Sequence, residues 1–141
     1  MAHGGKALPA CYALLERQDN QLELVNEPCR TAIIVDTALG IVGNGGFQYF
    51  FEANFPDDPD YGMFADAFRR AGLGEIAQGF SDLVAMFPFA APHRSVERRL
   101  RFLSDCPADF ARKMEELENL IYAREDLFSI AEDFLQHSTK Q

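Results

Sequence analysis

A run of glycines that leads directly into aromatic residues constrains this chain more than any other feature. Residues 42–56 read Val-Gly-Asn-Gly-Gly-Phe-Gln-Tyr-Phe-Phe-Glu-Ala-Asn-Phe-Pro. Glycine reaches positive φ and lets backbones approach closely, whereas each aromatic ring buries a large apolar area. The pattern therefore predicts a tight corner, followed by a short helix near residues 46–53. The residues of this corner and its aromatic anchors are Asn44, Gly45, Gly46, Phe47, Tyr49, Phe50, Phe51 and Phe55.

Apolar residues recur at helical spacing along most of the chain. Residues 31–42 are apolar on nearly every side, which predicts a central helix. Their β-branched content leaves a strand as the alternative, but no second strand is evident to pair with it. We predict further helices with inner stripes at Leu8, Tyr12 and Leu15, at Phe64, Phe68 and Ala71, at Ile76, Phe80, Leu83, Val84 and Phe87, and at Val96, Leu100 and Leu103.

Local signals mark several helix ends. Asp60 and Ser95 are predicted to cap the helices that follow them, and Gly72 suits the position just after a helix. Together these elements predict one all-α, compact multi-helix domain over residues 1–141, with short connections.

The last segment leaves two alternatives open. Its apolar residues fit a heptad seam that is interrupted at Arg124. A single helix of about 30 residues would be longer than usual for a globular domain, so a kink near residues 123–126 is the other interpretation. The seam consists of Met114, Leu117, Ile121, Phe128, Ala131 and Leu135.

The net charge of −9 disfavours contact with nucleic acids and anionic membranes. Residues 1–68 have 3 basic and 10 acidic groups, residues 69–113 have 8 and 5, and residues 114–141 have 2 and 7. Two acidic ends thus flank a weakly basic middle. Its arginines 94, 98 and 101, with Arg99 alongside, are predicted to form a solvated face, or to dock an acidic partner or the protein's own acidic termini.

Carboxylates recur at steps of seven in the last segment, at Glu118, Glu125 and Glu132, with Asp126 and Asp133 beside two of them. On a continuous helix this spacing forms one stripe, with neighbours roughly 10 Å apart. One interpretation is an ordinary charged outer face. The functional interpretation is a row of negative charge that a DNA-binding protein takes for phosphates.

Catalytic and cofactor signatures are weak. The sequence Gly72-Leu73-Gly74-Glu75-Ile76-Ala77 follows a predicted helix and not a strand, so it indicates a helix connection and not a nucleotide site. The acids at 57, 58 and 60 lack the glutamate that completes a calcium loop. The histidines 3, 93 and 137 have no catalytic partner at a recognisable spacing. We expect no cofactor and no metal.

Cysteine use and hydropathy suggest a location. Cys11, Cys29 and Cys106 are odd in number and widely spaced, which predicts unpaired thiols and neither a disulfide framework nor a zinc site. Residues 1–6 lack an apolar signal region, and no apolar run reaches the roughly 18 residues of a spanning helix. We expect a cytoplasmic protein that does not enter the membrane.

Several of these motifs together resemble a bacterial family of unknown function. They are Asn44-Gly45-Gly46-Phe47 with Tyr49-Phe50-Phe51, Asp60-Tyr61 before Ala67-Phe68-Arg69-Arg70-Ala71-Gly72, and Ala85-Met86-Phe87-Pro88. The resemblance covers about residues 25–137 and is to the domain of a DNA-mimic protein that blocks a transcription factor. It implies an all-α fold and an acidic homodimer that binds a helix-turn-helix repressor in place of DNA.

Three functional hypotheses follow. The leading one is a non-enzymatic, acidic protein-interaction module that mimics DNA and binds a DNA-binding regulator through the five carboxylates between 118 and 133. The second is an immunity-type or stress-associated protein that recognises its partner by shape, through an apolar patch with an aromatic centre. The third is a small enzyme with a pocket at residues 44–47 and Tyr49 or Glu52 as its acid–base group.

Overall fold

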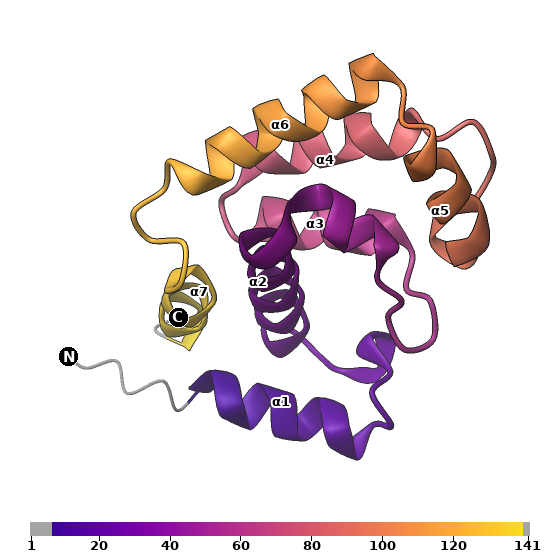
Figure 1. Ribbon diagram of the computed structural model, residues 1–141. Helices are drawn as coiled ribbons and strands as arrows, with labels where there is room; N and C mark the ends of the chain where they lie inside the picture. The colour runs from indigo at the N-terminus through magenta and orange to yellow at the C-terminus, as the bar shows by residue number, and fades with distance from the viewer. Residues whose placement is uncertain (1–6, 140–141) are drawn as a thin grey trace.

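Helix α2 (Cys29–Glu52) lies at the centre of the molecule, and the other helices surround it (Figure 1). The computed structural model describes residues 7–139, and all regular secondary structure within this range is helical. The all-α prediction is therefore confirmed, and residues 31–42 are helical. The other elements are α1 (Ala7–Arg17), η1 (Leu22–Leu24), α3 (Tyr61–Arg70), α4 (Gly74–Ala85), η2 (Pro92–Arg94), α5 (Val96–Ser104), α6 (Ala108–Tyr122) and α7 (Ile130–Thr139).

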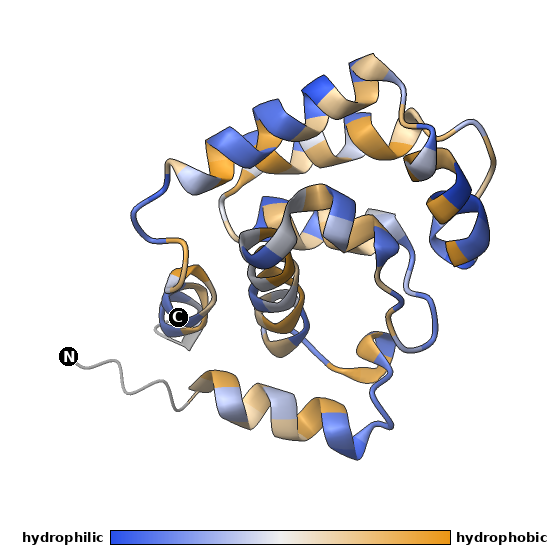
Figure 2. Cartoon of the chain, viewed as in Figure 1, coloured by the Kyte–Doolittle hydropathy of each residue, from blue (hydrophilic) through white to orange (hydrophobic). Residues whose placement is uncertain are grey.

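Phenylalanine rings from five helices form the main core. Phe80 on α4 lies at its middle and contacts the rings of Phe50, Phe64 and Phe68. A second, smaller apolar cluster joins α1 to α2 and α7. Figure 2 shows α6 as hydrophilic on its outer side and hydrophobic where it turns towards the rest of the molecule. The smaller cluster, which joins α1 to α2 and α7, contains Cys11, Val25, Ala32, Ile33, Ala131 and Leu135.

Two of the three cysteines are paired, which corrects the prediction of unpaired thiols. Cys11 on α1 forms a disulfide with Cys29 at the start of α2, and their Cα atoms are 5.1 Å apart. The pair is 18 residues apart in sequence, and it meets because α1 packs against α2. Cys106 is free. The prediction about residues 1–6, and with it His3, lies outside the described residues.

The glycine corner is a hinge inside α2, as predicted. Gly45 and Gly46 leave helical geometry, with φ and ψ of −155° and 15° and of 72° and −172°. The positive φ favours glycine at position 46, and a Cβ there would lie 2.6 Å from Glu118 Oε2, so that carboxylate would have to move. The chain then continues as a short helical segment, residues 47–52, which we call the distal segment of α2.

The distal segment directs three of its four aromatic rings into the core. Phe47, Phe50 and Phe51 are buried, and Phe55 beyond the segment packs against them. Tyr49 is 49% exposed, so its predicted burial is wrong. Positions 47, 50 and 51 share one helical face, whereas position 49 lies on the other side.

Two side chains of α6 form hydrogen bonds with backbone groups that the hinge leaves without helical partners. Glu118 Oε2 accepts a hydrogen bond from the Phe47 N–H at 2.8 Å. One turn later on the same face, the Tyr122 hydroxyl donates to the Val42 carbonyl at 2.8 Å. The carboxylate lies at the N-terminus of the distal segment, where a negative charge is favoured by the helix dipole.

A buried arginine holds the other end of the distal segment. Arg99 on α5 is 1% exposed and donates to the carbonyls of Phe51 at 2.7 Å, Ala53 at 3.0 Å and Pro92 at 2.8 Å. Its guanidinium also donates to Asn54 Oδ1 at 3.2 Å. A cation at a helix C-terminus is favoured by the dipole.

This burial corrects the predicted orientation of α5. Leu100, placed on the inner stripe by its spacing, is 45% exposed, and Arg99 takes the inner position near Leu103. The helix is turned because the carbonyls at the end of α2 require a donor that leucine lacks.

The last segment is two helices and not one. Helices α6 and α7 are separated by residues 123–129. The alternative of a break near residues 123–126 is therefore confirmed, and the continuous helix is wrong. Most of the predicted seam is buried, but Phe128 lies in the connection and is 90% exposed.

The predicted caps are confirmed, since Asp60 accepts from the Gly62 N–H at 2.7 Å and Ser95 from the Arg98 N–H at 3.2 Å. Gly72, with φ 82°, follows α3 as predicted.

Alanine substitutions at Gly46 in the hinge and at Gly43 before it separate backbone strain from helix propensity. We expect Gly46→Ala to lower the free energy of unfolding by at least about 2 kcal/mol, because it combines positive φ with a clash against Glu118. Gly43→Ala is the matched control, since a Cβ there meets nothing within 4 Å. It should be neutral or stabilise by up to about 1 kcal/mol. Urea unfolding followed by circular dichroism measures both, and equal effects would contradict this account of the hinge.

Replacing Arg99 tests the C-terminal contact. We expect Arg99→Leu to destabilise the protein by about 3 kcal/mol or more, because buried carbonyls lose their donors. Arg101→Leu on the same helix, where the side chain is 73% exposed, should change stability by less than about 0.5 kcal/mol. Both values come from the same urea titrations. A small effect at Arg99 would show that water replaces the guanidinium.

Candidate partner-binding surface

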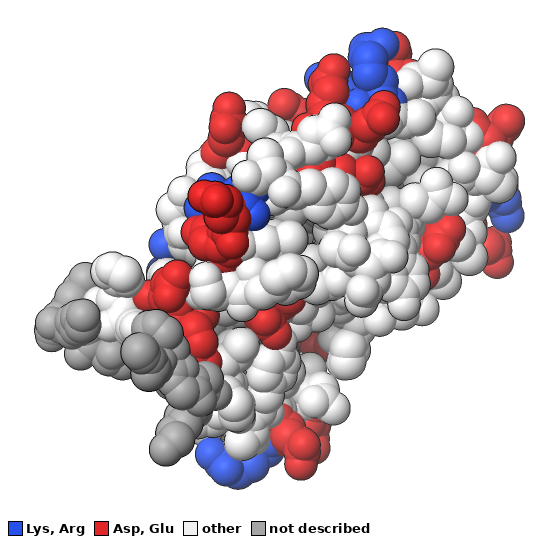
Figure 3. Space-filling model, turned by 60° about the vertical axis from the view of Figure 1, so that its left-hand side comes forward, with Lys and Arg blue, Asp and Glu red and all other residues white. Residues whose placement is uncertain are grey.

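The five carboxylates predicted to bind a partner do not form one helical stripe. Glu118 lies on α6, Glu125 and Asp126 lie in the connection, and Glu132 and Asp133 lie in the first turn of α7. The predicted regular spacing required a continuous helix, and the break between α6 and α7 removes it. Figure 3 shows acidic side chains in separate groups over one face of the molecule, divided by uncharged residues, with basic side chains beside several of these groups.

Glu118 is directed towards the hinge and not towards solvent. It is half-buried, and its Oε2 atom is occupied by the Phe47 N–H. Burial raises the pKa of the Tyr122 hydroxyl, and the negative charge of the nearby Glu118 carboxylate raises it further. Its position assigns Glu118 to the structure of α2 and not to an exposed surface.

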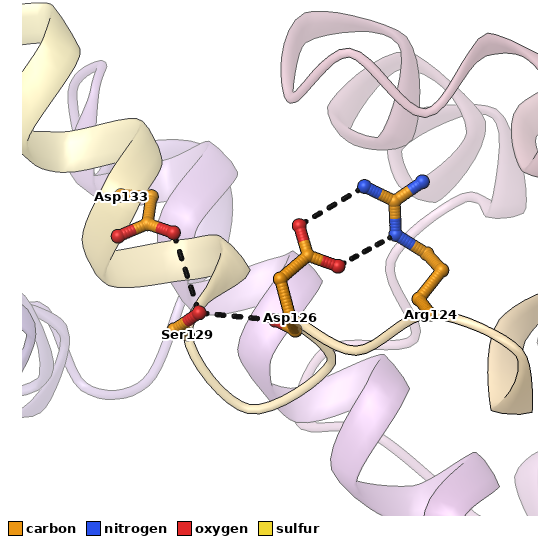
Figure 4. A network of polar contacts seen from close by, with 4 residues as sticks. All are labelled: Arg124, Asp126, Ser129 and Asp133. Atoms are coloured by element: carbon orange, nitrogen blue, oxygen red, sulfur yellow. Dashed lines mark hydrogen bonds and ion pairs between the residues drawn. The ribbon is translucent and has the colours of Figure 1, made fainter.

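Asp126 and Asp133 hold the connection between α6 and α7 (Figure 4). Asp126 accepts two hydrogen bonds from the Arg124 guanidinium, at 3.0 and 3.1 Å. These bonds keep the pKa of the Asp126 carboxyl below its usual range. The Ser129 hydroxyl lies within hydrogen-bond distance of the Asp126 carbonyl, at 3.2 Å, and of Asp133 Oδ2, at 3.3 Å.

Glu132 joins α7 to α1. Its Oε2 atom accepts a hydrogen bond from the Leu8 N–H at 3.0 Å, at the start of α1. Glu132 and Asp133 also lie in the first turn of α7, where carboxylates are favoured. A carboxylate that accepts one hydrogen bond keeps its charge and further acceptor sites, so both remain available to a cationic partner.

Glu125 is exposed, and none of the ion pairs found between residues 7 and 139 involves it. Asp126, by contrast, has its charge offset by Arg124. The residues that present uncompensated charge in this region are therefore Glu125, Glu132 and Asp133. We call these three residues the acidic surface.

The glycine corner is filled by protein atoms. A Cβ on Gly45 would lie 2.6 Å from the Tyr49 Cβ, and the space beside Gly46 is taken by Glu118. Asn44 is exposed and keeps helical geometry. The Tyr49 and Glu118 atoms leave no space for the substrate pocket that was hypothesised at residues 44–47.

Sequence reasoning missed Arg99 and Tyr122, and it gave Glu118 a different role. One signal pointed to these contacts. The distal segment begins after two glycines, without a Ser, Thr, Asp or Asn next to it, and ends at Ala53 without glycine. A helix with neither local cap needs distant donors and acceptors. The remaining arginines of that region, Arg94, Arg98 and Arg101, are exposed as predicted.

Two other kinds of site are absent from the described part of the chain. Among residues 7–139, no group of three or more histidine, cysteine or acidic side chains is placed to hold a metal ion. No helix in this range has the length and apolar character needed to cross a membrane.

The role of Glu118 can be measured as stability. We expect Glu118→Ala to lower the free energy of unfolding by about 1–2 kcal/mol, because the Phe47 N–H loses its charged acceptor. Glu118→Gln should fall between this variant and the wild type, since an amide oxygen accepts without charge. Glu115→Ala, exposed on the same helix, is the control and should stay within about 0.5 kcal/mol. If the two alanine variants unfold alike, Glu118 does not support the hinge.

Comparison with known proteins identifies the family of the chain. Neither curated proteins nor solved structures yield a match to this chain. A family model described as DMP19-like protein matches residues 23–138, which span the hinge, its two distant contacts and the acidic surface. Helix α1 lies outside the matched region. The chain therefore belongs to the DMP19-like protein family.

Proposed function

We propose that this protein is a non-enzymatic interaction module that presents carboxylates in place of DNA phosphates to a DNA-binding protein. The observation that carries the proposal is the acidic surface within a chain of the DMP19-like family. Residues 125–133 contain Glu125, Asp126, Glu132 and Asp133 and no lysine or arginine. A basic, DNA-binding surface is the complement of such a segment.

The fold supports this role by holding charges that would otherwise repel one another. Glu132 is anchored to the Leu8 N–H, and Asp133 lies beside the Ser129 hydroxyl. Both are therefore ordered before a partner arrives, which reduces the entropy lost on binding. Glu125 projects from the connection between helices, so the surface combines two fixed charges with one exposed charge.

The net charge of −9 adds a long-range component. It attracts a cationic partner and raises the association rate at low salt. The same charge repels nucleic acid, so the proposed partner is a protein. The cytoplasm, where DNA-binding regulators act, is the proposed location, and this proposal rests on the partner class and not on cysteine use, since Cys11 and Cys29 are paired.

Recognition by shape is a second candidate, because Phe128 is 90% exposed beside the acidic surface. An aromatic centre of this kind is typical of an interaction that depends on apolar burial. Removing charge from the acidic surface distinguishes the two candidates, since only the mimic depends on it.

The test uses the purified full chain, immobilised and exposed to extract from its source cells. We expect captured DNA-binding proteins that are released by duplex DNA and by raised salt. The triple variant Glu125→Gln, Glu132→Gln, Asp133→Asn should bind the captured protein at least about a hundredfold more weakly, because three charged contacts of about 1 kcal/mol or more each sum to about 3 kcal/mol.

The control is Glu16→Gln, Glu75→Gln, Asp82→Asn, which makes the same change in net charge at exposed positions elsewhere. It should retain binding within about twofold to threefold, as expected from screening of distant charges. Equal losses in both triple variants would reduce the proposal to a non-specific charge effect. A captured partner that is indifferent to salt and to duplex DNA would contradict mimicry.

A further inference from the structure

A groove beside α5 combines arginine side chains with phenylalanine rings. It has a volume of about 440 Å³ and lies between the chain that follows α4 and the outer side of α5. Its lining residues are Pro88, Phe89, Arg98, Arg101, Phe102 and Asp105. Aromatic surfaces with cations at the edge suit an acidic ligand that has an aromatic side chain.

The charge of the groove is mainly that of Arg98. Its guanidinium lies 5.9 Å from the centre of the Phe89 ring, and no ion pair among residues 7–139 includes it. Arg101 pairs with Glu97 at 3.1 Å, but both side chains are more than 70% exposed, so the pair exchanges readily with solvent. Asp105 also lines the groove and offsets part of this charge.

The same chain carries a segment with the complementary chemistry. Phe128 is 90% exposed, whereas the next most exposed large apolar side chain, Leu24, is 51% exposed. Glu125 and Asp126 precede it in the connection between α6 and α7. We call residues 125–128 the acidic–aromatic loop.

The loop and the groove cannot meet within one molecule. The groove adjoins the start of α6, and the loop follows its end, so the 15-residue helix separates them by about 22 Å. Figure 1 shows α5 and the connection to α7 at opposite ends of α6. Any contact between them must therefore join two copies.

We propose that the acidic–aromatic loop of one copy docks into the arginine–phenylalanine groove of a second copy. Phe128 packs against Phe89 and Phe102, and the carboxylate of Glu125 faces Arg98 and Arg101, while Asp126 stays paired with Arg124. The two surfaces differ, so the association is head-to-tail, and each bound pair keeps one free loop and one free groove. A two-fold dimer, in which both copies use the same patch, is a different arrangement. The contact is small, so the affinity is in the micromolar range or weaker, about 10 μM to 1 mM.

Two variants that each remove one half of the contact provide the test. Phe128→Ser removes the aromatic side chain and keeps the groove, whereas Arg98→Glu reverses the groove and keeps the loop. Fluorescently labelled Phe128→Ser is titrated with Arg98→Glu, and each variant is also titrated with itself. We expect the mixed pair to bind at least tenfold more tightly than either variant binds itself, and to weaken when NaCl is raised from 50 to 500 mM.

Controls separate this contact from other associations and from misfolding. Leu100→Ser, at an exposed position of α5 outside the groove, should self-associate as the wild type does. Arg101→Glu should reproduce the effect of Arg98→Glu if that variant is unfolded by circular dichroism. Three equal affinities would indicate association through another surface, and no binding in any titration up to about 1 mM would exclude the contact. Either result overturns the proposal, and neither affects the proposed binding of a DNA-binding protein.

Discussion

The six-residue distal segment of α2 depends on two opposite charges supplied by distant parts of the chain. Glu118 accepts from its first N–H, and Arg99 donates to carbonyls at its end. Each charge complements the helix dipole at the terminus that it contacts. Through the rings of Phe47, Phe50 and Phe51, this segment occupies the centre of the main core. The contacts of α5 and α6 with α2 thus determine how the core closes.

These contacts also divide the acidic residues into two groups. Glu118 completes the hinge and Asp126 is compensated by Arg124, so neither contributes an uncompensated exposed charge. Glu125, Glu132 and Asp133 retain theirs. A count of carboxylates therefore overstates the charge available for recognition, because a folded protein uses some of its anions as acceptors for its own backbone. The surface proposed for a DNA-binding partner is correspondingly smaller than the periodicity of the sequence indicates.

Sequence reasoning predicted the features that depend on neighbouring residues. The glycine hinge, the short helix after it and the caps at Asp60 and Ser95 are all seen. It was wrong about Leu100 and Tyr49 because apolar spacing alone does not show which face a helix turns inward. It was wrong about Cys11 and Cys29 because a pairing between α1 and α2 depends on how the helices pack. Family membership was also predictable, since the hinge motif is local and distinctive.

The sequence by itself determined the helical class, the position of the hinge and the acidic character of the chain. Each of these follows from backbone preferences, short-range spacing or composition. Only the tertiary structure decided that an arginine is buried, that a glutamate faces the hinge and that the last segment breaks into two helices. Unpaired backbone groups at a helix end can be satisfied by any suitable side chain that packing brings near, and packing among distant segments is not encoded in local spacing.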